Sequence, residues 1–358
     1  MNISDKNKMQ IINRQKHSVI YIVIFCIILL FIWSWFAFNT GNADYNIYKN
    51  WYITTCSNGL QYRFEIGFSM SMLIGAKLGL LYNQWLMIYS AIGIIMVGKS
   101  FYDYCNYPCI AVVMYFFYPY FFDVVQIRNF MAMAITFFAL RFLKKYNIKN
   151  VITYIGFVLL AMLFHVTAFF AFAYMLVYVE KSVNVVKIVS FVIATFCIIY
   201  FISPTTINKL LLFFGNEVYL EQGSSLIKLL GYGLWAVIAL VLSVIYDCQQ
   251  NNGKETNESY YFLIKIMPIL CLTVLLIGLS WQTYRFFRNI MPILYVVFIN
   301  NGIKVLGRKI RFKQIELINI IFACCVCGFF YFHQLSKGAE LYHTVTEKIL
   351  TCNSLWQR

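Results

Sequence analysis

The stretch that decides the fold runs from Gln126 to Phe170 and reads QIRNFMAMAITFFALRFLKKYNIKNVITYIGFVLLAMLFHVTAFF. Its two apolar runs, Asn129 to Leu143 and Val151 to Phe164, are joined by a short turn rich in lysine. Because basic residues concentrate on the cytoplasmic side of membrane helices, this pattern predicts a helical hairpin with its tip in the cytoplasm. The other ends of the two helices, which carry Arg128 and His165, are then expected at the external surface.

The composition of the chain agrees with a membrane protein. The 358 residues are 61% hydrophobic and 12% charged, whereas soluble domains contain about 25% charged residues. One membrane span needs about 20 apolar residues, and apolar runs separated by short polar turns occupy nearly the whole chain. We therefore predict an all-α, polytopic transmembrane helical bundle of about 11 to 12 membrane segments, with no room for a soluble catalytic domain.

The positive charge of the chain indicates its orientation. The net charge is +15, and the basic residues gather before the first apolar run, in the hairpin turn and between residues 304 and 313. Each cluster lies a few residues from a predicted span, as the positive-inside rule requires, and none alternates with exposed aromatic residues as in nucleic-acid-binding proteins. The N-terminus is therefore predicted to be cytoplasmic, and nucleic acid is not an expected partner.

The apolar pattern divides the chain into three parts. Residues 1–17 form a basic cytoplasmic N-terminus, and residues 335–358 form a C-terminal tail that the alternation of spans places outside. Residues 18–334 form a single transmembrane bundle, and its first apolar run is too long for a signal-peptide core. The bundle has predicted external loops at 39–64, 203–225 and 281–289.

One part of this topology conflicts with the alternation of spans. Glu65 and Arg128 are both predicted outside, so an even number of spans must separate them. Three apolar segments do: Ile66 to Leu81, Trp85 to Val97, and an aromatic stretch centred on Pro119. We predict that the Pro119 stretch is a broken or re-entrant element, which is tolerated where it is buried in protein or lines a cavity.

Four arginines on the predicted external side oppose the orientation rule, and they are the first candidates for a site. A guanidinium is charged at any relevant pH, and its donors match the oxygens of a phosphate. Their gathering at one surface predicts binding of a pyrophosphate or carboxylate. The alternatives are contact with lipid headgroups and pairing with Glu65 or Asp123. The four residues are Arg63, Arg128, Arg285 and Arg288.

Acidic and aromatic residues on the same side suit a sugar substrate. Asp44, Glu65 and His165 are candidate general bases for a hydroxyl group. Tyr45 and Tyr48 follow Asp44 and offer rings on which sugars stack, although an interfacial aromatic belt is the alternative interpretation. Residues typical of a metal site are scarce, so neither a metal nor a cofactor is expected.

Four short motifs follow one another between Asp44 and Phe170. They are Asp44-Tyr45 with Tyr48, Glu65-x-Gly67-Phe68, Ile127-Arg128-Asn129 and Phe164-His165-x-Thr167-Ala168. In order and spacing they resemble the EpsG family of Wzy-type polysaccharide repeat-unit polymerases, with a weaker similarity at Tyr284, Arg285 and Arg288. Two departures are Asn129, where the family has Gln, and Ile66, where the family has Pro before the glycine. The first keeps an amide, and the second affects only the entry turn.

The resemblance implies a multi-pass protein of the bacterial inner (cytoplasmic) membrane that polymerises oligosaccharide repeat units carried on undecaprenyl pyrophosphate. It implies catalytic roles for Asp44, Glu65, Arg128 and His165. Substrate binding is then expected at Tyr45, Tyr48, Arg63, Asn129, Tyr284, Arg285 and Arg288.

Beside the lipid-linked oligosaccharides and membrane lipid, a chain-length regulator and a flippase are candidate partners. Two other classes remain open. An O-antigen ligase or lipid-linked mannosyltransferase predicts a large external loop or an early acidic pair. A lipid-linked oligosaccharide flippase or other transporter predicts charges at mid-membrane depth.

Overall fold

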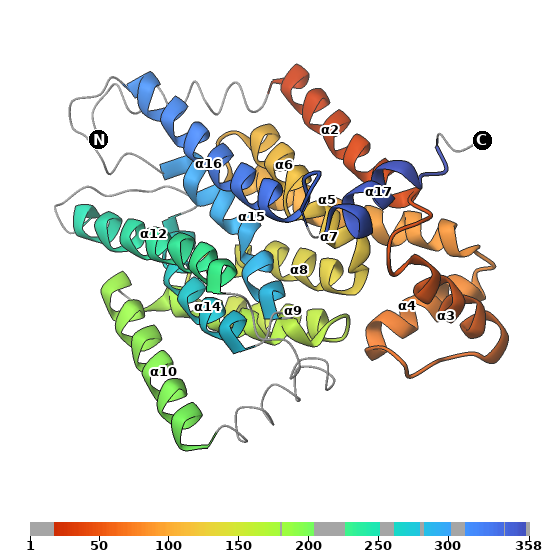
Figure 1. Ribbon diagram of the computed structural model, residues 1–358, viewed down its shortest axis with the longest axis horizontal. Helices are drawn as coiled ribbons and strands as arrows, with labels where there is room; N and C mark the ends of the chain where they lie inside the picture. The colour runs from red at the N-terminus through yellow and green to blue at the C-terminus, as the bar shows by residue number, and fades with distance from the viewer. Residues whose placement is uncertain are drawn as a thin grey trace.

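The computed structural model describes residues 18–179, 181–203, 226–250, 261–279, 283–301, 312–339 and 341–355. Within these ranges the chain is helical, and the only β pairing there is one antiparallel bridge between Asn39 and Asn353. The predicted N-terminal segment 1–17, almost all of the external loop 203–225 and most of the basic cluster 304–313 lie outside the described residues. The all-α class is confirmed for the part that is described (Figure 1).

Most consecutive helices of the described part are connected by short turns (Figure 1). They are α2 (Val19–Ala37), α3 (Tyr45–Asn58), α4 (Ile66–Lys77), α5 (Tyr82–Tyr104), α6 (Pro108–Phe117), α7 (Tyr120–Val125), α8 (Ile127–Ala139), η1 (Leu140–Leu143), α9 (Ile148–Met162), η2 (Val166–Tyr178), α10 (Ser182–Ile202), α12 (Leu226–Gln250), α13 (Tyr261–Ile264), η4 (Met267–Ile269), α14 (Leu270–Leu279), α15 (Tyr284–Asn301), α16 (Phe312–Gln334), η6 (Tyr342–Thr346) and α17 (Glu347–Thr351).

Two of the described helices, α2 and α5, are long and apolar enough to cross a membrane, and several shorter apolar helices accompany them. The apolar window of α2 has a mean hydropathy of 2.8, yet only 17% of it is buried. Large apolar side chains are also exposed on α10 and α12, among them Phe191 and Leu230. Soluble proteins rarely expose apolar surface on this scale, so the outside of the bundle suits lipid.

The predicted hairpin of residues 126–170 is present. Helix α8 continues into η1, and after the lysine-rich turn α9 runs back beside α8. Tyr154 of α9 donates a hydrogen bond of 2.7 Å to the carbonyl of Ala171 in η2, so α9 and η2 pack together. The Thr167 hydroxyl donates to the Asn129 side-chain oxygen at 2.9 Å, which joins the start of η2 to the start of α8. We call this end of the bundle the site end.

The opposite end of the bundle is identified by a second set of contacts. Asn300, near the end of α15, donates to the carbonyl of Tyr104 at 2.7 Å, and its side-chain oxygen accepts from the backbone N–H of Asn106 at 2.8 Å. Helices α5, α8 and α15 therefore all run from the site end to this opposite end.

The stretch around Pro119 is broken, as predicted, but it crosses the bundle. At its start, the backbone N–H of Cys109 donates to the Tyr21 hydroxyl, near the first turn of α2. Beyond Pro119, the Tyr120 hydroxyl donates to the carbonyl of Ile32 at 2.6 Å, close to the last turn of α2. Helices α6 and α7 thus run from the opposite end to the site end, with Pro119 between them.

The segment that does not cross is α4, and this removes the conflict in the predicted topology. Its 12 residues extend about 18 Å, short of the ~30 Å hydrocarbon core. The chain leaves α2 and enters α5 at the same end, because the indole N–H of Trp33 donates to the carbonyl of Met87. Helices α3 and α4 form a hairpin at that end, which Figure 1 shows beside the start of α5.

The C-terminal segment returns to the site end. The backbone N–H of Thr40 donates to the carbonyl of Cys352 at 2.8 Å, and that of Ser354 donates to the carbonyl of Phe38 at 2.9 Å. The described part of the C-terminal tail therefore lies against the connection between α2 and α3, a segment that is also predicted to be external.

Candidate functional site

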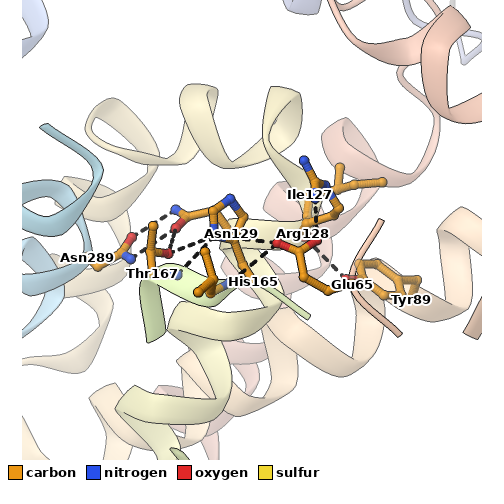
Figure 2. Close-up of polar contacts among 9 residues, drawn as sticks. Glu65, Tyr89, Ile127, Arg128, Asn129, His165, Thr167 and Asn289 are labelled. Atoms are coloured by element: carbon orange, nitrogen blue, oxygen red, sulfur yellow. Dashed lines mark hydrogen bonds and ion pairs between the residues drawn. The ribbon is translucent and has the colours of Figure 1, made fainter. Parts of the chain in front are cut away.

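Arg128 lies in the first turn of α8 and pairs with Glu65, the residue that precedes α4 (Figure 2). The guanidinium donates through Nη1 to Glu65 Oε2. It lies 4.7 Å from the ring centroid of Phe64, and Tyr48 is close by. The two charged side chains keep 23% and 21% of their surface exposed. An incoming anion can therefore reach this guanidinium.

Glu65 is also held from the other side. The backbone N–H of Val166, at the start of η2, donates to Glu65 Oε1 at 3.4 Å, and the backbone N–H of Gly67 donates to the carbonyl of Leu163 at 2.8 Å. A side chain at Gly67 would meet Leu163 at 2.7 Å, so glycine allows α4 to approach the end of α9 this closely. The hairpin of α3 and α4 is thereby fixed over the start of η2.

His165 is buried in the turn between α9 and η2, outside both helices. The backbone N–H of Thr167 donates to its Nδ1 at 3.2 Å, so His165 acts as the N-cap of η2. Burial, and then the charges of Arg285, Arg128 and Arg288, hold the pKa of His165 well below its usual value. The neutral ring therefore has its proton on Nε2, because Nδ1 accepts.

This assignment decides what His165 can do. Nδ1 lies 4.0 Å from Glu65 Oε1, but an unprotonated nitrogen and a carboxylate do not form an ion pair. A ring whose free nitrogen already carries the proton donates a hydrogen bond and does not accept a proton there. His165 is consequently suited to orient a substrate oxygen. The carboxylates of Asp44 and Glu65 are then the better candidates for a general base.

Asp44 precedes α3 on the same side, and its carboxylate caps no backbone N–H of that helix. Its backbone N–H donates to the Asn42 side-chain oxygen at 3.1 Å. Burial raises the pKa of Asp44, and the charges of Arg285 and Arg128 partly oppose this rise. The charges of both arginines thus act on Asp44 and on His165, which places these groups near one another at the site end.

A second arginine–acid pair lies deeper at the same end. Arg288 Nη2 is 3.6 Å from Asp123 Oδ1 and donates to Gln126 Oε1 at 2.9 Å. The Tyr115 hydroxyl donates to the other oxygen of Asp123 at 2.7 Å. Only 0% and 1% of the Arg288 and Asp123 side chains is exposed, so no ligand reaches this guanidinium without a rearrangement.

The two helices that bear these arginines are joined by a pair of asparagines (Figure 2). Asn129 Nδ2 donates to Asn289 Oδ1 at 2.9 Å, and Asn289 Nδ2 donates back to Asn129 Oδ1 at 3.1 Å. Asn129 Oδ1 also accepts the hydroxyl proton of Thr167. Both ends of the Asn129 amide are therefore occupied, and the side chain is completely buried.

The structure brings together most of the side chains that the sequence singled out. Asp44, Tyr48, Glu65, Arg128, His165 and Arg285 belong to one cluster at the site end. The alternative of pairing with Glu65 and Asp123 is found for Arg128 and Arg288.

The remaining predicted residues lie around the cluster. Arg63 is exposed just before Glu65. Tyr45 is buried and donates to Asn83 at 2.7 Å, and the hydroxyl of buried Tyr284 accepts from Gln126 at 3.2 Å. Trp281 and Gln282 of the predicted external loop lie outside the described residues, and α15 has already begun at Tyr284.

Sequence reasoning missed Gln126, Thr167 and Asn289 as members of the network. A signal for Asn289 was present, because the tetrad Arg128-Asn129-Phe130-Met131 returns as Arg288-Asn289-Ile290-Met291. Each arginine also pairs with an acid that follows a phenylalanine, in Phe64-Glu65 and Phe122-Asp123. The repeat is only four residues long, so it does not stand out as a period in the sequence.

A comparison of the sequence with models of protein families shows to which family the chain belongs. The model of the EpsG family matches residues 19–347, nearly the whole length. The chain belongs to the EpsG family. Members of this family are similar to Wzy-type polymerases, so this EpsG protein has a polymerase-like role in polysaccharide biosynthesis. Searches of curated proteins and of solved structures return no match.

Family and structure together indicate a helical membrane protein with a glycosyltransferase-like activity. Among the described residues, no group of three or more His, Cys, Asp and Glu side chains is placed to hold a metal ion. The site of this EpsG protein instead offers two accessible classes of group: guanidinium donors and carboxylates. Such a site can bind an anion and accept a proton within the same small volume.

Proposed function

We propose that this protein polymerises a surface polysaccharide at the external face of the bacterial inner membrane. Its substrates are oligosaccharide repeat units carried on undecaprenyl pyrophosphate, and the growing glycan passes from its lipid to the next lipid-linked unit. The observation on which the proposal rests is the partly exposed Arg128–Glu65 pair, with Arg285 and Asp44 near it.

The chemistry requires two kinds of group, and both are present. A hydroxyl oxygen of the acceptor sugar forms a bond to the anomeric carbon, and the bond from that carbon to the pyrophosphate oxygen breaks. Negative charge then builds on the leaving pyrophosphate, and preorganised cations in a water-poor site stabilise it. Arg128 and Arg285 supply these cations in the proposal.

The hydroxyl proton passes to Glu65 or Asp44. In the structure Glu65 holds Arg128, so an arriving pyrophosphate competes for the guanidinium and releases the carboxylate. The raised pKa of Asp44 makes its carboxylate a stronger base than an ordinary one. His165 donates from Nε2 to an oxygen of the substrate in this arrangement.

The direct test uses the purified full-length protein in detergent and synthetic lipid-linked repeat units. Gel separation of the products is expected to show units joined in twos and longer chains, and the Arg128→Ala protein, present in equal amount, is expected to yield none. If the wild-type protein leaves the units unjoined but moves them across vesicle membranes, the polymerase proposal is wrong and a transporter replaces it.

A further inference from the structure

The first turn of α8, which positions Arg128, is held from both sides by α15. Gln126, just before α8, accepts a hydrogen bond of 2.9 Å from Arg288. Asn129, just after Arg128, exchanges two hydrogen bonds with Asn289. Arg128 therefore lies between two residues, Gln126 and Asn129, which are held by the adjacent α15 residues Arg288 and Asn289 respectively.

Helix α15 also carries Arg285, in its first turn and about one turn before Arg288 and Asn289. The contacts between α8 and α15 consequently set where the Arg128 guanidinium stands relative to that of Arg285. Reciprocal amide pairs between helices are suited to such a role, because a side-chain amide bonds well in one register only, whereas apolar side chains tolerate a shift along the helix.

We propose that Asn289 is a positioning residue: its reciprocal bonds with Asn129 hold α8 and α15 in the register at which Arg128 and Arg285 bind one diphosphate together. Asn289 itself does not touch the ligand. This inference rests on the diphosphate site of the proposed function and deepens it, since it explains how two helices that begin at separate points of the chain act on one anion.

The buried arginine pair supports the proposal by its geometry. Asp123 neutralises Arg288, Tyr115 holds Asp123, and Gln126 accepts a hydrogen bond from Arg288 Nη2, so this guanidinium makes its contacts inside the protein. Arg288 and Asn289 occupy the positions in their tetrad that Arg128 and Asn129 occupy in theirs. One copy of the motif is thus exposed to ligand, and the other supports it.

The experiment measures binding of inorganic pyrophosphate to the detergent-solubilised full-length protein by titration calorimetry. Asn289→Ala is expected to weaken binding roughly tenfold, and Asn129→Ala/Asn289→Ala by no more than the larger single effect, because the two residues act as one unit. Asn300→Ala is the control, since it removes a hydrogen-bonded asparagine amide from the other end of α15 and is expected to leave the affinity unchanged.

A second variant separates positioning from folding. Asn129→Leu/Asn289→Leu removes both partners of the pair, and the Thr167 hydroxyl, which loses Asn129 as acceptor, still has His165 Nδ1 at 3.0 Å. The change therefore costs little stability when the shapes match. It is expected to keep the melting temperature near that of the wild type but to bind pyrophosphate as weakly as Asn289→Ala. Wild-type affinity in both Asn289 variants would overturn the inference.

The outcomes distinguish this inference from the proposed function. If Asn289→Ala binds pyrophosphate and joins repeat units like the wild type, the polymerase stands and the positioning role falls. If the wild type joins no repeat units but binds pyrophosphate in an Asn289-dependent manner, the positioning role stands without the polymerase. A wild-type protein that does not bind pyrophosphate contradicts the shared diphosphate site, and the inference falls with it.

Discussion

Arg128 and Arg288 occupy similar surroundings and differ in exposure. Each stands before an asparagine in its helix, each lies over a phenylalanine ring, and each pairs with the acid that follows that phenylalanine. The Arg128 pair keeps about a fifth of its surface exposed, whereas the Arg288 pair is buried completely. A guanidinium can serve as a ligand group only where water has access, so the same motif provides a binding group in one place and a structural link in the other.

The largest effect is expected from breaking the buried pair. Arg288→Ala leaves the Asp123 carboxylate without its cation inside the bundle, which is expected to lower the free energy of unfolding by about 3 to 5 kcal/mol. Thermal unfolding in detergent, with the amount of protein in the membrane, measures this. Arg288→Met combined with Asp123→Leu is expected to recover much of the stability, and an Arg288→Ala protein as stable as the wild type would contradict the structural role.

Breaking the exposed pair is expected to cost activity and not stability. Arg128→Ala removes a cation from the leaving pyrophosphate, for which losses of about 10²- to 10³-fold in rate are typical. The melting temperature is expected to change little, because the partner Glu65 remains partly hydrated. Product chain length on gels, measured beside the melting temperature, checks both halves, and a destabilised but active Arg128→Ala protein would reverse the assignment of the two arginines.

The pH dependence of the rate tests the acid beside the exposed pair. Burial raises the pKa of Asp44, despite the opposing charges of Arg285 and Arg128. If Asp44 is the base, the rate falls as pH decreases through this raised pKa, above the ~3.9 of an ordinary aspartate, because a protonated carboxyl cannot accept the proton.

Two aspartate variants make this test specific. Asp44→Asn is expected to lower the rate and to remove its fall at low pH. Asp103→Asn changes an acid that pairs with Lys99 and Arg141 instead, and is expected to keep the fall at low pH. If the rate of Asp44→Asn still falls at low pH, the proton is assigned to Glu65.

The smallest effect is expected at the two phenylalanines. A cation over an aromatic ring gains about 0.5 to 2 kcal/mol, more where water is excluded. Phe122→Leu is therefore expected to lower the melting temperature slightly, and Phe64→Leu to lower the rate a few-fold with the stability nearly unchanged. Equal effects of the two variants on stability would remove the distinction between the two arginines.

Periodicity and charge predicted much of the fold. The hairpin from α8 to α9 follows from two apolar runs and a lysine-rich turn, and Arg128 and His165 lie at one end because both adjoin the far ends of that hairpin. The error concerned which segment fails to cross. Ile66 to Leu81 is apolar enough for a span, but α4 ends at Lys77 and stays at the site end beside α3. Apolar composition alone does not distinguish a helix that crosses from one that folds back.

The sequence by itself determined the helical class, the end of the bundle where the arginines gather, and the residues around which a site forms, because hydrophobic runs and unusual charges are local properties of a chain. Only the tertiary structure decided that Arg128 is accessible while Arg288 is enclosed, that His165 accepts a hydrogen bond at Nδ1, and that Asn129 and Asn289 join two helices. These properties depend on contacts between residues 160 or more positions apart, and burial and hydrogen-bond partners at that separation exist only once the helices have packed.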